Sequence, residues 1–367
     1  MSREGHRAGD VSWRGAALAL AAAGLFGAST PIAKLLLAHL DPWFLAAVLY
    51  LGSGLGLTLF RLLRRGLQRD VKVEAGLAPG DWAWLLGAIA CGGVVGPVLL
   101  LSGLVLTGAA TASLLLNLES VFTALLAWFV FRENVDRRIA LGMAAIAAGA
   151  VILSWPGPAS QAAPGSFWGA LAIAGACLAW ALDNNLTRRV SLADPVLIAM
   201  LKGLAAGSVN LVLALWLGSP ARLEGLSPGA ILAGAALGMA AYGLSLVLFV
   251  LALREIGAAR TGAYYASAPF IGAILAVLAL GEPATIQLAL AGLLMLAGLW
   301  LHLTEYHVHE HEHPPLAHTH AHRHDAHHQH DHGPGDPPGE PHSHRHAHIR
   351  LRHSHRHFPD AHHSHAH

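Results

Sequence analysis

The sequence predicts an all-α integral membrane protein, with ten transmembrane helices followed by a disordered C-terminal tail. Of its 367 residues, 54% are hydrophobic and 12% are charged, whereas an average soluble domain has about 25% charged residues. The mean hydropathy is +0.49, although a very polar tail enters that average. Apolar stretches long enough to cross a bilayer recur along the chain, since about 20 such residues span the hydrocarbon core.

Ten apolar stretches are expected to span the membrane. A polar lead at 1–14 precedes the first of them, which is long enough to be retained as a helix rather than cleaved as a signal peptide. The break between the third and fourth is short, from Val105 to Gly108. The ten spans are expected at 15–37, 42–62, 82–104, 109–131, 138–155, 167–187, 195–217, 229–253, 260–280 and 285–303.

The distribution of positive charge predicts the orientation. With ten spans and a cytoplasmic N-terminus, the inner segments that precede the tail hold fifteen Lys and Arg residues and the outer loops hold only Arg222. Cytoplasmic loops of membrane proteins carry such an excess. Tryptophans near predicted span ends fit the aromatic belts of a bilayer. We therefore expect a multi-pass protein of the inner (plasma) membrane with both termini in the cytoplasm.

The two halves of the chain resemble each other. Asp41-Pro42 opens the second span and Asp194-Pro195 opens the seventh, while Gly108-Ala109-Ala110 and Gly257-Ala258-Ala259 open the fourth and ninth. We expect five-helix repeats at 15–155 and 167–303, joined by an uncharged linker at 156–166. Because five spans is an odd number, the second copy must insert upside down, as in the inverted repeats of many transporters.

The repeat resembles the EamA unit of the drug/metabolite transporter superfamily. The resemblance rests on Gly27 to Lys34, on the small residues from Gly108 to Leu116, and on Phe131-Arg132-Glu133 and Leu280-Gly281-Glu282. It implies a small-molecule transporter. The family often has proline in the middle of the fourth span; this chain has Glu119-Ser120 there but keeps Pro269 in the ninth. We therefore expect a helix break only in the ninth span.

Several polar side chains lie within the predicted spans. An ionisable group at the bilayer centre costs about 2.5–3.5 kcal/mol, so such groups should face protein or a water-filled cavity. We expect them to line a transport pathway, where a carboxylate can carry a proton. The alternative is an inter-helix ion pair or hydrogen bond that only locks the bundle. The candidates are Lys34, Asn117, Glu119, Asp183, Asn184, Asn185 and Lys202.

Other polar groups fit simpler roles. Lys34 lies near the outer end of its span and can extend its ammonium to the headgroups. Glu133 and Glu282 lie at opposite membrane faces and are expected to act as helix-end or loop partners of nearby arginines. Trp180 lies deeper than the other tryptophans and is a candidate to line a cavity. Tyr242, Tyr264 and Tyr265 are candidate hydrogen-bond donors in such a cavity, with packing as their alternative role.

The tail at 304–367 has a different chemistry. Of 26 histidines, 23 fall between His307 and His367, and a segment so poor in apolar residues is expected to be disordered. Imidazoles two residues apart can chelate Zn, Ni, Cu or Co. The alternative is an unselected repeat expansion without a metal role. The candidate ligands are His318, His320, His322, His324, His342, His344, His346 and His348.

Three functions can be compared with these features. The first is a secondary transporter, expected to be an exporter, of a small organic metabolite or drug. The second is a transition-metal transporter or metal-regulated permease whose tail collects the cargo. The third, a membrane-anchored metal sensor, would leave the ten spans and the inverted repeat unexplained. No catalytic motif is evident, so neither an enzyme nor a required cofactor is expected. The expected partners are a small-molecule substrate, lipid, divalent metal at the tail and a possible homodimer, but no nucleic acid.

The orientation makes a first testable prediction. Single cysteines placed at Gln68 and at Ser160, in a chain whose Cys91 and Cys177 are replaced by serine, are treated with an impermeant thiol reagent in intact cells. Because the positive-inside rule places 156–166 outside, we expect labelling at Ser160→Cys and none at Gln68→Cys. The opposite pattern would refute the topology.

Overall fold

The structure is a computed structural model. It describes residues 13–67, 76–131, 137–155, 166–190, 193–217, 226–303, 308–313, 316–322, 342–348 and 351–356. Almost all of the predicted lead and linker, together with Glu133, therefore lies outside the described residues.

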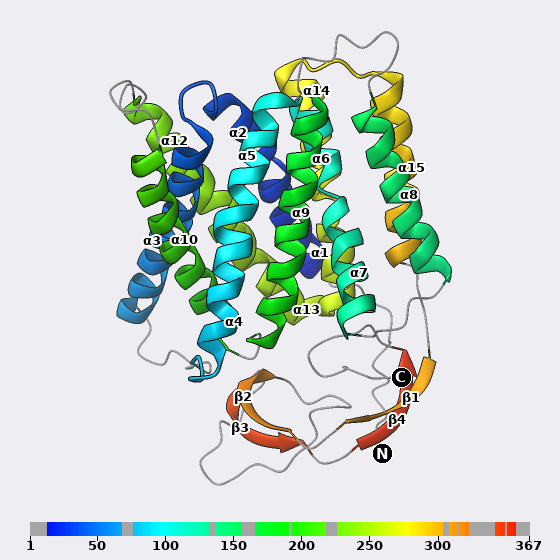
Figure 1. Cartoon of the computed structure of the whole chain (residues 1–367). Coiled ribbons are helices and arrows are strands. Elements are labelled where there is room, and N and C mark those ends of the chain that lie inside the picture. Colours follow the sequence, from blue (N-terminus) through cyan, green and yellow to red (C-terminus); the bar gives the residue numbers. More distant parts are fainter. Residues whose placement is uncertain are drawn as a thin grey trace.

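The predicted helical membrane fold is confirmed (Figure 1). Within the described part, nine helical stretches are long and apolar enough to cross a membrane, and a tenth, Ile286–Leu301, is shorter. The first half comprises α1 (Trp13–Gly27), α2 (Ser29–Leu36), α3 (Pro42–Leu67), α4 (Asp81–Ala88), the π-helix η1 (Ile89–Val95), α5 (Gly96–Leu106), α6 (Ala109–Leu115), α7 (Leu118–Phe131) and α8 (Arg137–Ser154). The second comprises α9 (Ser166–Arg189), α10 (Pro195–Leu217), α12 (Pro228–Gly238), the π-helix η2 (Met239–Leu244), α13 (Ser245–Tyr265), α14 (Ala268–Leu280) and α15 (Ile286–Leu303).

The two halves interdigitate instead of forming separate bundles. The helix pairs with the most extensive contacts all join one half to the other: α3 with α10 and α12, α8 with α15, α1 with α13, α5 and α7 with α9, and α6 with α14. Glycines permit the closest approaches. A Cβ added to Gly238 would lie 2.0 Å from the carbonyl oxygen of Leu49. Close packing of small residues is the main source of helix association in lipid.

The Asp-Pro motifs cap the start of a helix in the same way in both halves. The Asp41 Oδ1 accepts hydrogen bonds from the backbone N–H groups of Trp43 and Phe44, at the start of α3. The Asp194 Oδ1 accepts the equivalent bonds at the start of α10. Aspartate satisfies otherwise free N–H groups at a helix start, and proline needs no acceptor there. Asp194 also forms an ion pair of 2.5 Å with Arg61 of α3.

The prediction of a helix break only in the ninth span was wrong. The ninth span breaks at Ala266–Ser267, between α13 and α14, but the fourth also breaks at Leu116–Asn117, between α6 and α7. No proline lies at this break, and polar side chains bind the backbone carbonyls beside it. The Asn117 amide donates to the carbonyl of Leu114 (2.8 Å), and the Ser120 hydroxyl donates to the carbonyl of Asn117 (2.7 Å). The loop expected at 254–259 is helical and belongs to α13.

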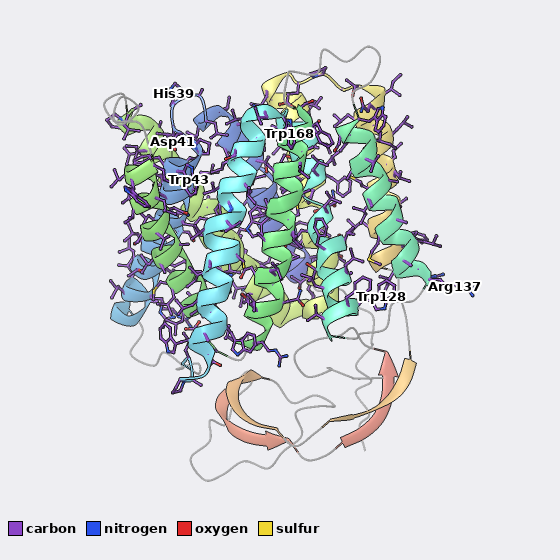
Figure 2. The ribbon with its side chains drawn as sticks, viewed as in Figure 1. His39, Asp41, Trp43, Trp128, Arg137 and Trp168 are labelled. Atoms are coloured by element: carbon purple, nitrogen blue, oxygen red, sulfur yellow. The ribbon has the colours of Figure 1, made fainter. Side chains whose placement is uncertain are left out.

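Aromatic residues mark two levels along the helices (Figure 2). Trp43 and Trp168 lie toward the end of the bundle that carries His39, whereas Trp128 lies near Arg137 at the opposite end. Trp128 and Trp168 are exposed at 44% and 66%. Amphipathic rings are favoured at the headgroup level, so these positions fit the two interfaces of a bilayer.

Four segments of the histidine-rich tail are extended, where the sequence predicted disorder. Strands β1 (Val308–His313) and β4 (Leu351–Arg356) pair antiparallel, as do β2 (Leu316–His322) and β3 (His342–His348). An alternating sequence has the two-residue period of a strand, and backbone hydrogen bonds can pair such segments without an apolar core. Seven candidate ligands lie on β2 and β3; the eighth, His324, lies outside the described residues.

Candidate functional site

A cavity of about 500 Å³ lies between α3, α9, α10 and the segment formed by η2 and α13. Most of its wall is apolar or aromatic, and its polar groups come from six residues. Its lining residues are Tyr50, Ser53, Asp183, Thr187, Ile198, Ala199, Lys202, Gly203, Tyr242, Leu246, Phe249 and Val250. Both halves of the chain therefore contribute, as expected for a site between inverted repeats.

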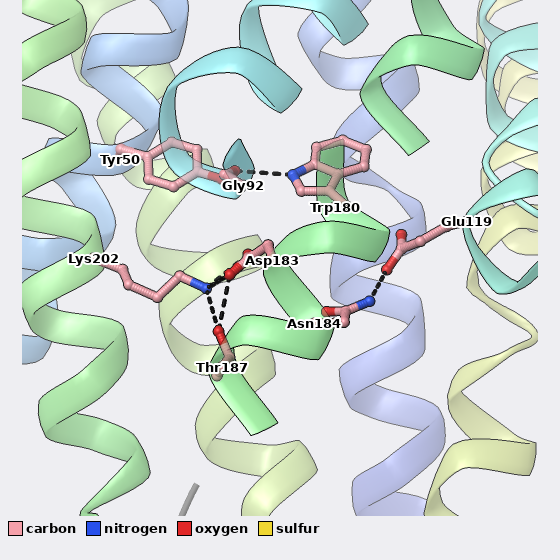
Figure 3. Close-up of polar contacts among 8 residues, drawn as sticks. All are labelled: Tyr50, Gly92, Glu119, Trp180, Asp183, Asn184, Thr187 and Lys202. Carbon is pink, nitrogen blue, oxygen red and sulfur yellow. Dashed lines mark hydrogen bonds and ion pairs between the residues drawn. The ribbon is translucent and has the colours of Figure 1, made fainter. Parts of the chain in front are cut away.

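An ion pair occupies one wall of this cavity. The Lys202 ammonium on α10 lies 2.5 Å from the Asp183 Oδ1 and 2.7 Å from its Oδ2 on α9 (Figure 3). Thr187, one helical turn after Asp183, donates its hydroxyl to the Asp183 Oδ1 (2.9 Å), and the ammonium lies 3.3 Å from that hydroxyl. The side chains of Lys202 and Asp183 are 18% and 10% exposed. The pair neutralises two charges that would each be costly alone.

The π-helix η1 forms the support behind Asp183. A π-helical turn lacks some of the normal i→i−4 bonds, and such turns are frequent at functional sites. The Gly92 carbonyl of η1 accepts hydrogen bonds from the Tyr50 hydroxyl (2.7 Å) and the Trp180 indole (2.9 Å). A Cβ on Gly92 would lie 1.9 Å from the Asp183 Oδ2. Only glycine leaves space for the carboxylate there.

Aromatic rings form a second part of the cavity wall. Tyr242 of η2 stacks on Tyr50 of α3, with ring centroids 5.5 Å apart, and contacts Phe26 of α1 edge to face at 5.9 Å. Phe249 contacts Tyr265 at 4.9 Å. Such pairs hold rings in fixed relative orientations. A ligand in the cavity would therefore meet a preformed aromatic surface.

Glu119 lies on the other side of α9. Its Oε1 accepts a hydrogen bond from the Asn184 amide (2.7 Å), and Figure 3 shows Asp183 and Asn184 pointing to opposite sides of the helix. Glu119 is half-buried, while Asn184 is exposed. The two carboxylates are thus connected through consecutive residues of one helix. The structure brings Asp183 and Lys202 together in the cavity and places Glu119 outside its lining.

Most of the remaining predicted residues do not line the cavity. Lys34 binds backbone carbonyls at the end of α5, Asn117 stabilises the break in its own span, and Asn185 donates to the carbonyl of Ala181 within α9 (2.8 Å). Trp180 supports η1. Of the three predicted tyrosines, Tyr242 lines the cavity, whereas Tyr264 and Tyr265 do not. The sequence analysis missed Tyr50, Ser53, Thr187 and Phe249. Only Thr187, four residues after Asp183, carried a helical-spacing signal.

The cavity can select by both shape and charge. Its apolar and aromatic walls favour organic molecules, while the ion pair presents one donor group and one acceptor group to a polar substituent. A ligand that binds either partner of the pair must compensate the charge left on the other. Binding is therefore expected to rearrange this ion pair.

The ion pair makes a prediction of stability. Lys202→Met or Asp183→Asn leaves one partner largely buried without its counter-charge, which costs about 3–5 kcal/mol for buried pairs. The double variant removes both charges and should be more stable than either single variant. Thermal unfolding of the four purified proteins in detergent measures this. Additive losses would show that the two charges do not stabilise each other.

Comparisons with known proteins agree with this geometry. The sequence profile described as "EamA-like transporter family" matches residues 13–155 and again 167–304. An "uncharacterized transporter" of Methanothermobacter thermautotrophicus is 32% identical over 290 residues, covering 75% of this chain and 82% of the relative. A protein of known crystal structure has a similar fold, with a TM-score of 0.54 and 21% identity over 78% of this chain and 95% of its own. The chain is therefore a membrane transporter that belongs to the EamA-like transporter family.

Proposed function

We propose that this protein is a secondary transporter that exports a small organic metabolite or drug across the cytoplasmic membrane. The observation that carries the proposal is the cavity, which combines apolar and aromatic walls with one ion pair. Such a lining suits an organic molecule with a polar or charged substituent. The cavity lies between inverted halves whose relative movement would expose it to one side at a time. Flux into proteoliposomes, measured over a panel of metabolites and drugs, tests this proposal.

We propose Glu119 as the group that couples transport to an ion gradient. It is a half-buried acid within a span, and its carboxylate accepts a hydrogen bond from the neutral amide of Asn184. Asn184 follows Asp183 directly on α9, so a movement of α9 driven by the ion pair would also move the partner of Glu119. A proton or cation at Glu119 and a substrate in the cavity would then act on the same helix.

The role of Glu119 can be tested by charge removal. Glu119→Gln keeps the shape and can still pair with Asn184, but it cannot change charge. We expect substrate-driven exchange to be lost or uncoupled from the ion gradient at unchanged expression, with a fall of at least about tenfold, as in loss of a group that acts in the cycle. Asp81→Asn, which removes an acid at the start of α4, is the matched control. Wild-type coupled flux by Glu119→Gln would leave Glu119 a packing role only.

We also propose that the tail binds divalent metal ions as an accessory to transport. The support is its composition, with 23 imidazoles between His307 and His367, and neutral imidazole is a good ligand for Zn, Ni, Cu and Co. The alternative function, transport of a transition metal, has less support, because the cavity is lined mainly by carbon atoms. Location in the inner membrane, cytoplasmic termini and a homodimer remain part of the proposal.

The tail proposal is tested by truncation and titration. The full-length protein and a chain ending at Tyr306 are titrated calorimetrically with Ni²⁺ at pH 7.5 and pH 5.5. Because histidine has a pKa of about 6.5 and metal binds its neutral form, we expect binding at the higher pH that weakens at the lower. The truncated chain should lose this binding and keep organic-substrate flux. Equal heats from both proteins at pH 7.5 would exclude a metal role for the tail.

A further inference from the structure

The short turn between α5 and α6, residues 107–108, is held by two charged side chains from different halves of the protein. The Lys34 ammonium of α2 donates to the carbonyl oxygens of Leu104 (2.5 Å) and Thr107 (2.8 Å), at the end of α5. The Glu282 carboxylate, from the segment between α14 and α15, accepts from the backbone N–H groups of Ala109 (2.6 Å) and Ala110 (2.8 Å).

Each charge has the sign that its helix end favours. The last carbonyls of a helix attract a cation, and the first N–H groups attract an anion. The two side chains also interact electrostatically with each other. Together they satisfy backbone groups of α5 and α6 that no helical partner satisfies. We call this arrangement, Lys34 and Glu282 around residues 104–110, the Lys34–Glu282 clasp.

The clasp lies at the membrane face opposite the ion pair of the cavity. A Cβ on Gly169, near the start of α9, would lie 2.7 Å from the Thr107 side chain, so the start of α9 is beside the clasp. Asp183 is fourteen residues further along α9, which corresponds to about 21 Å of helix. The lining residues Ile198 to Gly203 belong to the beginning of α10, directly after the turn that ends α9.

We propose that Lys34 and Glu282 are positioning residues that close one face of the transporter, and that their release opens this face to the cavity. The proposal rests on the alternating exposure described under the proposed function. The clasp joins α2 of the first half to the α14–α15 connection of the second, so the halves cannot separate there while it is intact. Its bonds are charge-assisted and local, and they can therefore be broken without unfolding a helix.

Gly108 offers a way to strain the clasp without removing either charge. A Cβ at this position would lie 2.9 Å from the Glu282 Oε2, so the carboxylate would have to shift. The backbone of Gly108, with φ −68° and ψ 150°, is one that alanine adopts without strain. Gly108→Ala should therefore weaken the clasp in the same direction as Glu282→Gln, through a different physical change.

The test measures thiol reactivity at two positions of the purified full-length protein, with Cys91 and Cys177 replaced by serine. Thr30→Cys reports on the clasp face, because Thr30 is buried one turn before Lys34 in α2. Ala199→Cys reports on the cavity wall. In Glu282→Gln, Lys34→Met or Gly108→Ala, we expect maleimide labelling at Thr30→Cys to rise about tenfold, the effect of losing a charge-assisted bond on an open–closed equilibrium. Labelling at Ala199→Cys should fall.

Asp41→Asn is the matched control, since it also removes the charge of a helix-capping carboxylate, but at the start of α3; it should leave labelling at Thr30→Cys unchanged. Unchanged labelling at Thr30→Cys in folded Glu282→Gln would overturn the proposal. A rise at both reporter positions would also overturn it, because it would indicate general loosening. If Glu282→Gln does not fold, Gly108→Ala decides by the same criteria. Labelling needs no substrate, so failure of the proposed function would leave this result standing.

Discussion

A polypeptide in a hydrocarbon solvent must satisfy its backbone N–H and C=O groups within the protein, and this constraint explains most of the structure. At several places where a described span departs from a regular α-helix, a specific side chain compensates. Tyr50 and Trp180 bind the free carbonyl of Gly92 in η1. Asn117 binds a carbonyl beside the break in the fourth span, and Lys34 and Glu282 bind the facing ends of α5 and α6.

These compensated breaks also position the cavity. Irregular backbone at membrane depth is tolerated only where protein or a cavity covers it, and both π-helices adjoin the site: η1 supports Asp183, while η2 contributes Tyr242. The absence of a side chain at Gly92 lets the carboxylate approach η1, so that Lys202 can reach it from α10. The polar site therefore depends on packing between three spans that are far apart in the sequence.

The interdigitation of the halves connects the site to the rest of the bundle. The second span packs along the seventh, and the third along the sixth, so α9 contacts η1, α5 and α7 at the same time. Asp183 and Asn184 point to opposite sides of this one helix, toward Lys202 and Glu119. A shift of α9 would alter both pairs, which gives a simple physical basis for coupling between a substrate and an ion.

The sequence by itself determined the membrane class, the positions of nearly all spans, the internal repeat and the family, because hydropathy and motif spacing are local properties. It also identified Lys202 and Asp183 as unusual, since a charged residue within an apolar span can be recognised from the sequence alone.

Only the tertiary structure decided which charges meet. It paired Lys202 with Asp183, assigned Glu119 to Asn184, and moved Lys34 from the pathway to a helix end. It also revealed Tyr50 and Phe249 in the cavity. Their roles depend on which side of each helix faces its neighbour. In spans that are apolar all around, the sequence has no hydrophobic periodicity from which that side could be predicted.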